Sequence, residues 1–314
     1  MADFKKTVDK LFDSADIQIN GPRSWDPQVN NDLFYARILS GGSLALGESY
    51  MDGWWDCDSL DQFGDKLLSA RIDKKVKITN PYFLMNIVRA YLFNAQTTKR
   101  AYIVGTEHYD IGNDLFSLML DERMNYSCGY WRKAENLEQA QINKLDLICR
   151  KLHLKPGMTV LEIGCGWGSF AKYAAENYGV SVHGVSISKE QVSYAKKSCE
   201  GLDVSFELKD YRELNKKYDC IVSIGMFEHV GYKNYRNYMK VVNRCLKDDG
   251  LFLLHTIGRN NPGRATDPWI NKYIFPNGMS PSSSQICKSI EGLFVIEDWH
   301  NFGQDYDATL VAWN

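Results

Sequence analysis

The sequence predicts an α/β fold in which helices cover both faces of a mostly parallel sheet. From about residue 139, short apolar runs alternate with helical patterns, and a glycine-rich turn over Gly164–Gly168 follows the first run. This alternation is typical of doubly wound sheets. The expected strands are Met158–Cys165, Val182–Ile187, Val204–Leu208, Cys220–Phe227, Leu251–Ile257 and Phe294–Trp299.

Helical spacing accounts for the segments between these runs. Residues Gln139–Leu152 read as a helix that Pro156 and Gly157 bring to an end. A second helix is predicted where apolar side chains recur at helical intervals, at Tyr235, Tyr238, Val242 and Leu246. Asp305–Trp313 has the pattern of the first turns of a third helix.

The N-terminal segment predicts a small helical unit. Its first apolar face is formed by Phe4, Val8, Leu11 and Phe12. A short helical run over Asp32–Leu39 is expected to stop at Gly41 and Gly42. The aromatic stretch Leu44–Trp55 is either a turn packed on a core or part of a lipid-facing surface. We therefore expect a small N-terminal domain over 1–80, a basic helical linker over 81–105 and a catalytic domain over 106–314.

Composition excludes several functional classes. The 314 residues carry a formal net charge of −2, whereas nucleic-acid-binding domains usually show a basic excess. The eight cysteines form no CxxC pair, which predicts reduced thiols in the cytosol and no metal site. Residues 71–100 are locally basic, and this stretch is either a solvated connector or a patch for anionic lipid headgroups.

The glycine-rich turn is the strongest motif for ligand binding. Gly164, Gly166 and Gly168 have GxGxG spacing, and the acidic Glu162 precedes them at the end of a strand. This pattern resembles class I S-adenosylmethionine (SAM) methyltransferases, in which the glycines let the backbone approach the cofactor. A P-loop is excluded because no lysine follows at the required position. The alternative is a tight strand-to-helix turn without a ligand.

Two further positions are candidates for contacts with the nucleoside. The second expected strand ends without the acid that usually holds the ribose, but Ser186 and Gln191 lie there, and an amide can also bond a diol. After the third strand, Asp210 is expected to meet the adenine amino group. Its alternative role is a helix cap.

Five further segments are distinctive, and they are Gly47–Trp55, Glu107–Phe116, Asn125–Trp131, Gly225–Gly231 and Pro268–Gly278. Together they resemble the bacterial cyclopropane-fatty-acyl-phospholipid synthases, and the resemblance extends over essentially the whole chain. The resemblance implies a SAM-dependent enzyme that converts a cis double bond of a phospholipid acyl chain into a cyclopropane ring. It also implies a bound bicarbonate ion as the base, and it adds Tyr126 and Ser127 to the expected SAM contacts.

The resemblance further implies which residues hold the bicarbonate. They are Cys128, Glu228, His255, Tyr306 and the backbone N–H of Ile257. Several of them follow expected strands, and ligands of open α/β sheets lie beyond the carboxyl ends of strands. Taken singly, each has a simpler alternative: His255 a satisfied histidine at a strand end, Tyr306 an aromatic at a helix start, Cys128 a small buried apolar residue.

Other activities remain as alternatives. Members of the family usually continue beyond the point where this chain ends, so we expect the last, antiparallel strand of the methyltransferase sheet to be missing. A shortened non-catalytic SAM- or lipid-binding remnant, or one half of a split enzyme, is therefore a second hypothesis. A third is a related methyltransferase that yields a methyl branch or a hydroxylated product. A serine hydrolase is excluded because no G-x-S-x-G motif is present.

The resemblance also implies where the protein acts. We expect a cytoplasmic protein, peripheral to the inner face of the cell membrane, that forms a homodimer and contacts unsaturated phospholipid. The N-terminus has charges where a signal peptide would need an apolar stretch, and no run approaches the ~20 apolar residues of a membrane span.

Overall fold

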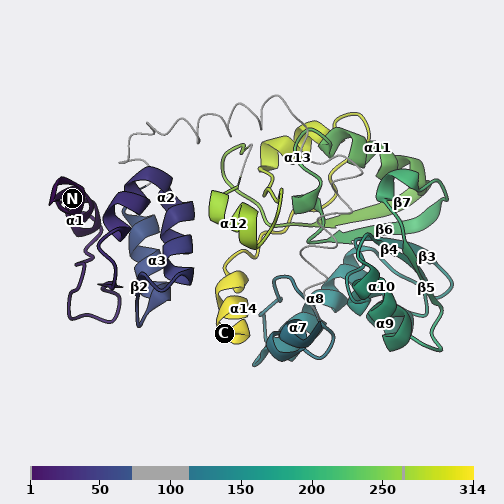
Figure 1. The fold of residues 1–314 in the computed structure, drawn as a ribbon. Helices are drawn as coiled ribbons and strands as arrows, with labels where there is room; N and C mark the ends of the chain where they lie inside the picture. The colour runs from purple at the N-terminus through teal and green to yellow at the C-terminus, as the bar shows by residue number, and fades with distance from the viewer. Residues whose placement is uncertain (1, 73–112, 264–265) are drawn as a thin grey trace. The chain divides into compact units, whose positions relative to one another are not determined.

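The computed structural model describes residues 2–72, 113–263 and 266–314 (Figure 1). The expected linker over 81–105 lies outside the described residues, as does part of the family-like segment Glu107–Phe116. The chain divides into two compact units, of which the first is Met1–Phe93 with Asp267–Pro276 and the second is Asn94–Thr266 with Asn277–Asn314. Asp267–Pro276 thus departs from the expected continuous domain over 106–314 and packs with the N-terminal unit.

The first unit is built from short helices around an aromatic core. Its elements are α1 (Ala2–Asp13), β1 (Gln28–Val29), α2 (Phe34–Met51), β2 (Trp55–Asp56), α3 (Leu60–Ser69) and α12 (Pro268–Tyr273). Phe34, Trp55 and Phe63 are almost fully buried, and their rings pack against one another. Val8 and Phe12 of α1 join this core and Leu11 packs against it, which confirms most of the predicted apolar face, whereas Phe4 is 47% exposed.

The helical stop predicted at Gly41 and Gly42 is confirmed as an interruption of α2, although not as its end. Gly42 has φ 58° and ψ −138°, so it bends the chain, but the helix resumes and α2 continues to Met51. Glycine tolerates a positive φ without a steric penalty, which allows a bend where a stop was expected. The stretch Leu44–Trp55 is therefore largely helical. Trp55 lies in the core and its indole N–H donates to the carbonyl of Leu46 and to Ser49 Oγ.

Two of the family-like segments meet where α2 packs on α12. A Cβ at Gly47 would lie 2.3 Å from Cδ1 of Trp269, so only glycine permits this approach of the helix to the indole. Glu48 Oε1 accepts hydrogen bonds from Lys272 Nζ at 2.6 Å and from the Tyr273 hydroxyl at 2.9 Å. The glycine and the acid in Gly47–Trp55 are thus explained by packing within the first unit.

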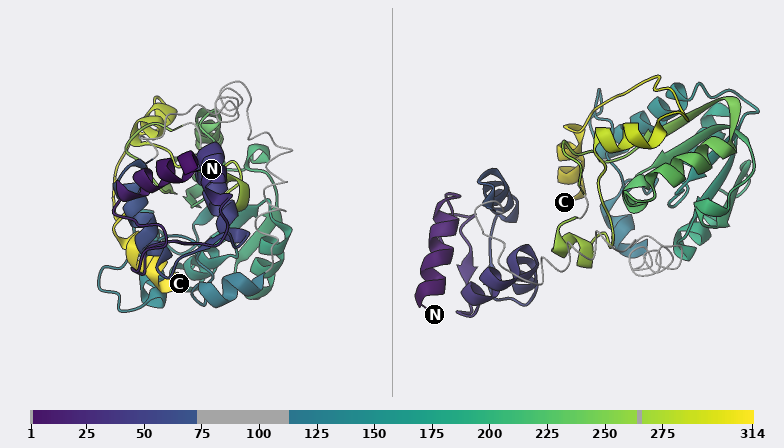
Figure 2. Two further views of the ribbon diagram at one scale, coloured as in Figure 1. Left: turned by 60° about the vertical axis from the view of Figure 1, so that its left-hand side comes forward. Right: turned by 90° about the horizontal axis from the view of Figure 1, so that it is seen from above.

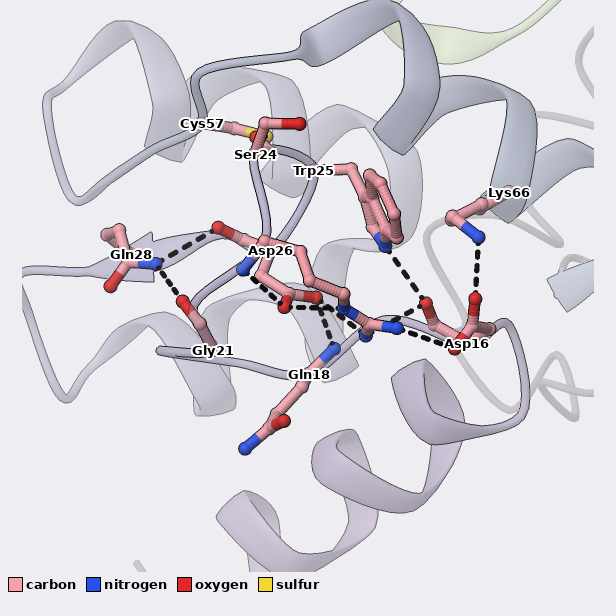
Figure 3. A network of polar contacts seen from close by, with 10 residues as sticks. Asp16, Gln18, Gly21, Ser24, Trp25, Asp26, Gln28, Cys57 and Lys66 are labelled. Atoms are coloured by element: carbon pink, nitrogen blue, oxygen red, sulfur yellow. Dashed lines mark hydrogen bonds and ion pairs between the residues drawn. The ribbon is translucent and has the colours of Figure 1, made fainter.

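A buried carboxylate fixes the loop between α1 and β1 (Figure 3). Asp26 accepts hydrogen bonds from the Arg23 guanidinium and from the backbone N–H groups of Gln18 and Arg23. Arg23 also bonds Asp16, which in turn accepts from Lys66 of α3. Because the side chain of Asp26 is fully buried, each of these donors offsets its loss of hydration.

The second unit is built on a five-stranded parallel sheet. The strands are β3 (Thr159–Ile163), β4 (Ser181–Ser186), β5 (Val204–Leu208), β6 (Tyr218–Ile224) and β7 (Leu246–His255). They lie in the order β5-β4-β3-β6-β7, and every neighbouring pair is parallel. The order reverses between β3 and β6, which makes this the switch point of the sheet. In the described residues no antiparallel strand joins this sheet.

Helices cover both faces of the sheet, as predicted (Figures 1 and 2). One core cluster contains side chains of α8 (Leu137–Lys151), α9 (Ser169–Tyr178) and α10 (Lys189–Ser198). The other contains side chains of α11 (Tyr235–Cys245) and α13 (Ser283–Ile290). Along β6, Cys220 and Val222 belong to the first cluster and Ile221 to the second, because successive side chains of a strand point to opposite faces.

The sixth expected strand is wrong. Phe294–Trp299 belongs to no helix or strand of the described residues, and Val295 is 84% exposed. Phe294 still packs on Phe252 of β7, so the apolar run contributes to the core without joining the sheet. A strand requires a hydrogen-bonded neighbour, which local hydrophobicity cannot supply. The predicted helix Asp305–Trp313 is confirmed as α14.

Within the parts of the chain that the structure covers, no helix is long and apolar enough to cross a membrane. All eight cysteines are free thiols, and Cys287 is the exposed one among them.

Candidate cofactor pocket and anion site

A cavity opens at the carboxyl ends of the central strands of the second unit. It lies at the switch point, where open α/β sheets bind their ligands. The residues predicted to contact SAM that line it are Tyr126, Ser127, Glu162, Gly164, Gly166, Ser186, Gln191 and Asp210. Gly168 does not line the cavity, and the structure gives it a different role.

The glycine-rich turn brings the backbone to the cavity wall. Gly164, Gly166 and Gly168 have φ values of 85°, 50° and 88°, a region that side chains rarely adopt. A Cβ at Gly166 would meet nothing within 4 Å, so this glycine leaves open space in the cavity. A Cβ at Gly168 would lie 3.0 Å from both Ala195 and Phe206, so this glycine lets α9 begin close to the neighbouring elements.

Glu162 presents a buried carboxyl to the cavity. It is 3% exposed, and its Oε2 has no hydrogen-bond partner among the described residues. Burial raises the pKa of Glu162 well above its ordinary value, although the Ala171 N–H and the nearby Lys144 counteract this. An acceptor without a partner at a buried position indicates that a ligand donor belongs there.

The nucleoside side of the cavity holds the other predicted contacts. Ser186 Oγ donates to Gln191 Oε1 at 2.9 Å, so the amide nitrogen of Gln191 is left to face a ligand. Asp210 accepts from the backbone N–H of Arg212 at 2.9 Å and pairs with its guanidinium at 3.0 Å. The helix-cap alternative for Asp210 is therefore confirmed, and its adenine contact stays a prediction.

Glu228 begins a second group of functional side chains beside the cavity. It lies in a 3-10 helix over Phe227–His229, directly after β6, and its Oε1 accepts from the backbone N–H of Ile257 at 2.7 Å. The Ile257 N–H, predicted as a donor to the anion, is thus engaged by Glu228 in this structure. Oε2 of Glu228 and Nδ1 of His255 are buried without a hydrogen-bond partner among the described residues.

Burial sets the protonation of this group. It raises the pKa of Glu228 above its ordinary value, with the Ile257 N–H acting in the opposite direction. It lowers the pKa of His255 to about 3, helped by the positive charge of Lys144, so the imidazole is neutral at physiological pH. His255 is the last residue of β7, as predicted, and its ring stacks on Phe302.

Helix α14 brings Tyr306 to the same region. Thr309 on this helix accepts from the Gly129 N–H at 3.1 Å and from the Trp131 indole N–H at 2.9 Å, which anchors α14 beside Cys128. Burial raises the pKa of Tyr306, and the nearby Cys128 and Glu228 raise it further. Burial also raises the pKa of Cys128 to about 11. Both groups therefore keep their protons and can act as donors.

The structure thus brings the predicted residues into two adjoining groups. The SAM contacts line the cavity, whereas Cys128, Glu228, His255, Ile257 and Tyr306 lie outside its lining, although Ser127 and His229 next to them line it. Sequence reasoning missed Thr309 and the buried Lys144, because their partners come from segments remote in the chain. The second group combines the neutral side chains of Cys128, His255 and Tyr306 with the acceptor Oε2 of Glu228. This combination fits a small anion that carries a hydroxyl proton.

This sheet order, with a glycine turn at its switch point, defines a class I SAM-dependent methyltransferase. The sequence profile of the mycolic acid cyclopropane synthetase family matches residues 96–314. The chain belongs to this family.

Relatives and solved structures agree with this assignment. The chain is 58% identical over 311 residues to the cyclopropane-fatty-acyl-phospholipid synthase of Escherichia coli K12, covering 98% of this chain and 80% of that protein. It is 36% identical to cyclopropane mycolic acid synthase 3 of Mycobacterium tuberculosis, covering 66% and 78%. The structure of mycolic acid cyclopropane synthase CmaA1 complexed with SAH matches with a TM-score of 0.63 and 33% identity, covering 68% and 81%.

Proposed function

We propose that this protein transfers a methylene carbon from SAM to the cis double bond of an unsaturated phospholipid acyl chain, forming a cyclopropane ring. The similarity to the Escherichia coli enzyme over 98% of the chain supports the phospholipid substrate. The observation that carries the proposal is a SAM cavity next to two buried atoms without a hydrogen-bond partner among the described residues, Glu228 Oε2 and His255 Nδ1.

We propose that the second group holds bicarbonate. When bound, SAM supplies an electrophilic methyl group and bicarbonate supplies a base that removes a proton as the ring closes. Two anions side by side repel each other, so the Glu228 carboxylate is proposed to accept a hydrogen bond from the hydroxyl of that ion, which offsets the repulsion. The protonated Tyr306 supplies a donor to its other oxygens, and the Cys128 thiol, which donates to the Gly129 carbonyl at 3.3 Å in this structure, would supply another after turning from that carbonyl.

The surrounding residues serve to hold these groups in a dry environment. The neutral His255 can donate from one ring nitrogen and accept at the other, so it bonds an anion without carrying a charge into the core. Tyr126, Trp313 and Phe116 form an aromatic cluster next to the cavity. Aromatic faces stabilise a nearby cation and exclude the water that would trap it.

We further propose that the protein works as a homodimer, peripheral to the inner face of the membrane. The lipid substrate motivates the membrane contact, since the protein has to reach the acyl chain in a bilayer. Sedimentation of the protein with vesicles of anionic phospholipid, and light scattering of the free protein, measure these two properties. A monomer that stays in the supernatant would contradict both.

The test of the activity uses the purified 314-residue chain with SAM and vesicles of monounsaturated phospholipid. Mass spectrometry of the acyl chains, before and after ozone treatment that cleaves double bonds, is expected to show a gain of one CH₂ in a chain that ozone no longer cleaves, and this product depends on bicarbonate in the buffer. A methyl branch that keeps unsaturation, or an added oxygen, would instead indicate a related methyltransferase. A chain that binds SAH but forms no product would be a non-catalytic remnant or one half of a split enzyme, and the proposal would fail.

A further inference from the structure

A buried lysine lies directly behind the wall of the SAM cavity. Lys144, in the middle of α8, is 1% exposed and belongs to the largest fully buried side chains of the protein. Its Nζ donates to Ser127 Oγ at 2.7 Å and to Asn125 Oδ1 at 3.2 Å. A buried ammonium is costly unless it is paired and hydrogen-bonded, so its retention in the core calls for an explanation beyond packing.

The wall itself is held by a network that converges on this lysine. Gln141, one helical turn before Lys144, donates from Nε2 to the Ser127 carbonyl at 2.9 Å. Ser169, the first residue of α9, donates to Asn125 Oδ1 at 2.8 Å. The segment that carries Ser127 is therefore tied to α8 on one side and to the helix after the glycine-rich turn on the other.

The hydrogen-bond chemistry of lysine determines how Ser127 is oriented. An ammonium has three donors and no acceptor, so Ser127 Oγ must accept from it. The hydroxyl proton of Ser127 then points away from Lys144, and no hydrogen bond from this hydroxyl to a described residue occurs. Since Ser127 lines the cavity, its proton is available to an acceptor on the ligand.

The charges around Lys144 match the amino-acid end of SAM, which carries a carboxylate and an ammonium. Lys144 provides a positive charge behind Ser127, and Glu162 presents its unpartnered Oε2 to the same cavity. The remaining charged or titratable groups near Lys144 are Asp121, Cys128 and His255. Of these, Asp121 is engaged by two hydrogen bonds from Asn125.

We propose that Lys144 is a positioning residue that orients the Ser127 hydroxyl as a donor to the α-carboxylate of SAM and adds a buried positive charge behind it. This inference rests on the proposed SAM site and assigns a recognition role to a residue that does not line the cavity. It predicts that replacing Lys144 weakens the binding of ligands that carry the amino-acid end and leaves the binding of ligands without this end unchanged.

The test compares two ligands by calorimetry. S-adenosylhomocysteine carries the amino-acid end, whereas 5′-methylthioadenosine lacks it. In Lys144→Met, which keeps an unbranched side chain one atom shorter and has no donor or charge, the Kd for S-adenosylhomocysteine is expected to rise about tenfold or more. The Kd for methylthioadenosine is expected to stay within about twofold. The matched control is Leu145→Met, a fully buried neighbour on α8, which should change neither Kd.

Two outcomes with Lys144→Met overturn the proposal. Equal weakening of both ligands by Lys144→Met would show a general structural role, and unchanged affinity for both would show no role. Should Lys144→Met fail to fold, Ser127→Ala decides, since it removes the other end of the bond from a cavity-lining position. Ser127→Ala is expected to weaken the binding of S-adenosylhomocysteine and not that of methylthioadenosine. A Kd for S-adenosylhomocysteine equal to that of the unaltered chain would overturn the proposal. If the unaltered chain binds neither ligand, the SAM site itself is wrong.

Discussion

Replacing Glu228 by glutamine separates the anion site from the cofactor cavity. Glu228 does not line the cavity, so we expect Glu228→Gln to leave the Kd for SAM unchanged within about twofold. The amide oxygen can keep the 2.7 Å bond from the Ile257 N–H. The substitution places an NH₂ donor where Oε2 was, and it removes the charge that holds the hydroxyl of the proposed bicarbonate.

The size of the effect follows from that lost contact. A hydrogen bond to a charged group contributes about 1.5–3 kcal/mol, and each 1.36 kcal/mol on the barrier is tenfold in rate. We therefore expect kcat to fall by about ten- to a hundredfold. We do not expect the stability of the protein to fall. Because the pKa of Glu228 is raised in the folded protein, the folded state is most stable with this carboxyl protonated and loses stability as the pH rises through that pKa. Glutamine cannot ionise and so avoids this loss.

Rates of cyclopropane formation at saturating SAM, together with calorimetric titration of SAM, measure the two quantities separately. Glu213→Gln is the matched control, since Glu213 is an exposed acid of the same unit and its replacement should change neither kcat nor Kd. A parallel loss of SAM affinity and turnover in Glu228→Gln would refute the division into two groups.

Three further predictions address the turn, helix α14 and the first unit. Gly166→Val is expected to abolish binding of S-adenosylhomocysteine in calorimetry, because its φ of 50° strains a branched residue and its Cβ enters the cavity; retained tight binding would contradict the role of the turn. Thr309→Val removes the acceptor for Gly129 and the Trp131 indole, so kcat should fall severalfold while SAM affinity persists; an unchanged kcat would show that α14 does not position Tyr306. Arg23→Met should lower the free energy of unfolding of the first unit by about 2–3 kcal/mol in urea melts at pH 7, because a buried carboxylate loses its partner. Burial would raise the pKa of the Asp26 carboxyl, but the Arg23 guanidinium and the backbone N–H groups hold that pKa below its ordinary value of 3.8. The stability that the Arg23–Asp26 pair contributes is therefore present above pH 3.8 and is lost as the pH falls through the pKa of Asp26 in the folded protein. In strong acid, urea unfolding should show no difference between Arg23→Met and the unaltered chain.

The central part of the fold could be predicted from the sequence because its signals are local. The strand before Gly164 is apolar apart from Thr159 and Glu162, and the glycines that follow have the positive φ values that favour glycine. His255 was placed correctly at the end of β7, and Glu228 lies just beyond the end of β6, because an apolar run of strand length leads to each. Parallel strands then bring such ends to one edge of the sheet.

The remaining features depend on contacts between distant segments. Lys144 lies in a helix of mixed polarity, and only its bonds to Ser127 and Asn125 reveal that it is buried. Phe294–Trp299 has the composition of a strand, but pairing depends on a neighbour. Gly42 has the sequence of a helix stop, yet the apolar side of α2 continues to pack beyond it, since Ala45 and Ser49 are buried.

Expression of this chain in a bacterium that makes no cyclopropane lipids tests the central claim most directly. The account predicts that membrane phospholipids acquire acyl chains heavier by one CH₂ and lacking the double bond, and that Glu228→Gln expressed at an equal level gives far fewer. Lipids that keep every double bond, in cells containing the folded protein with SAM bound, would contradict it.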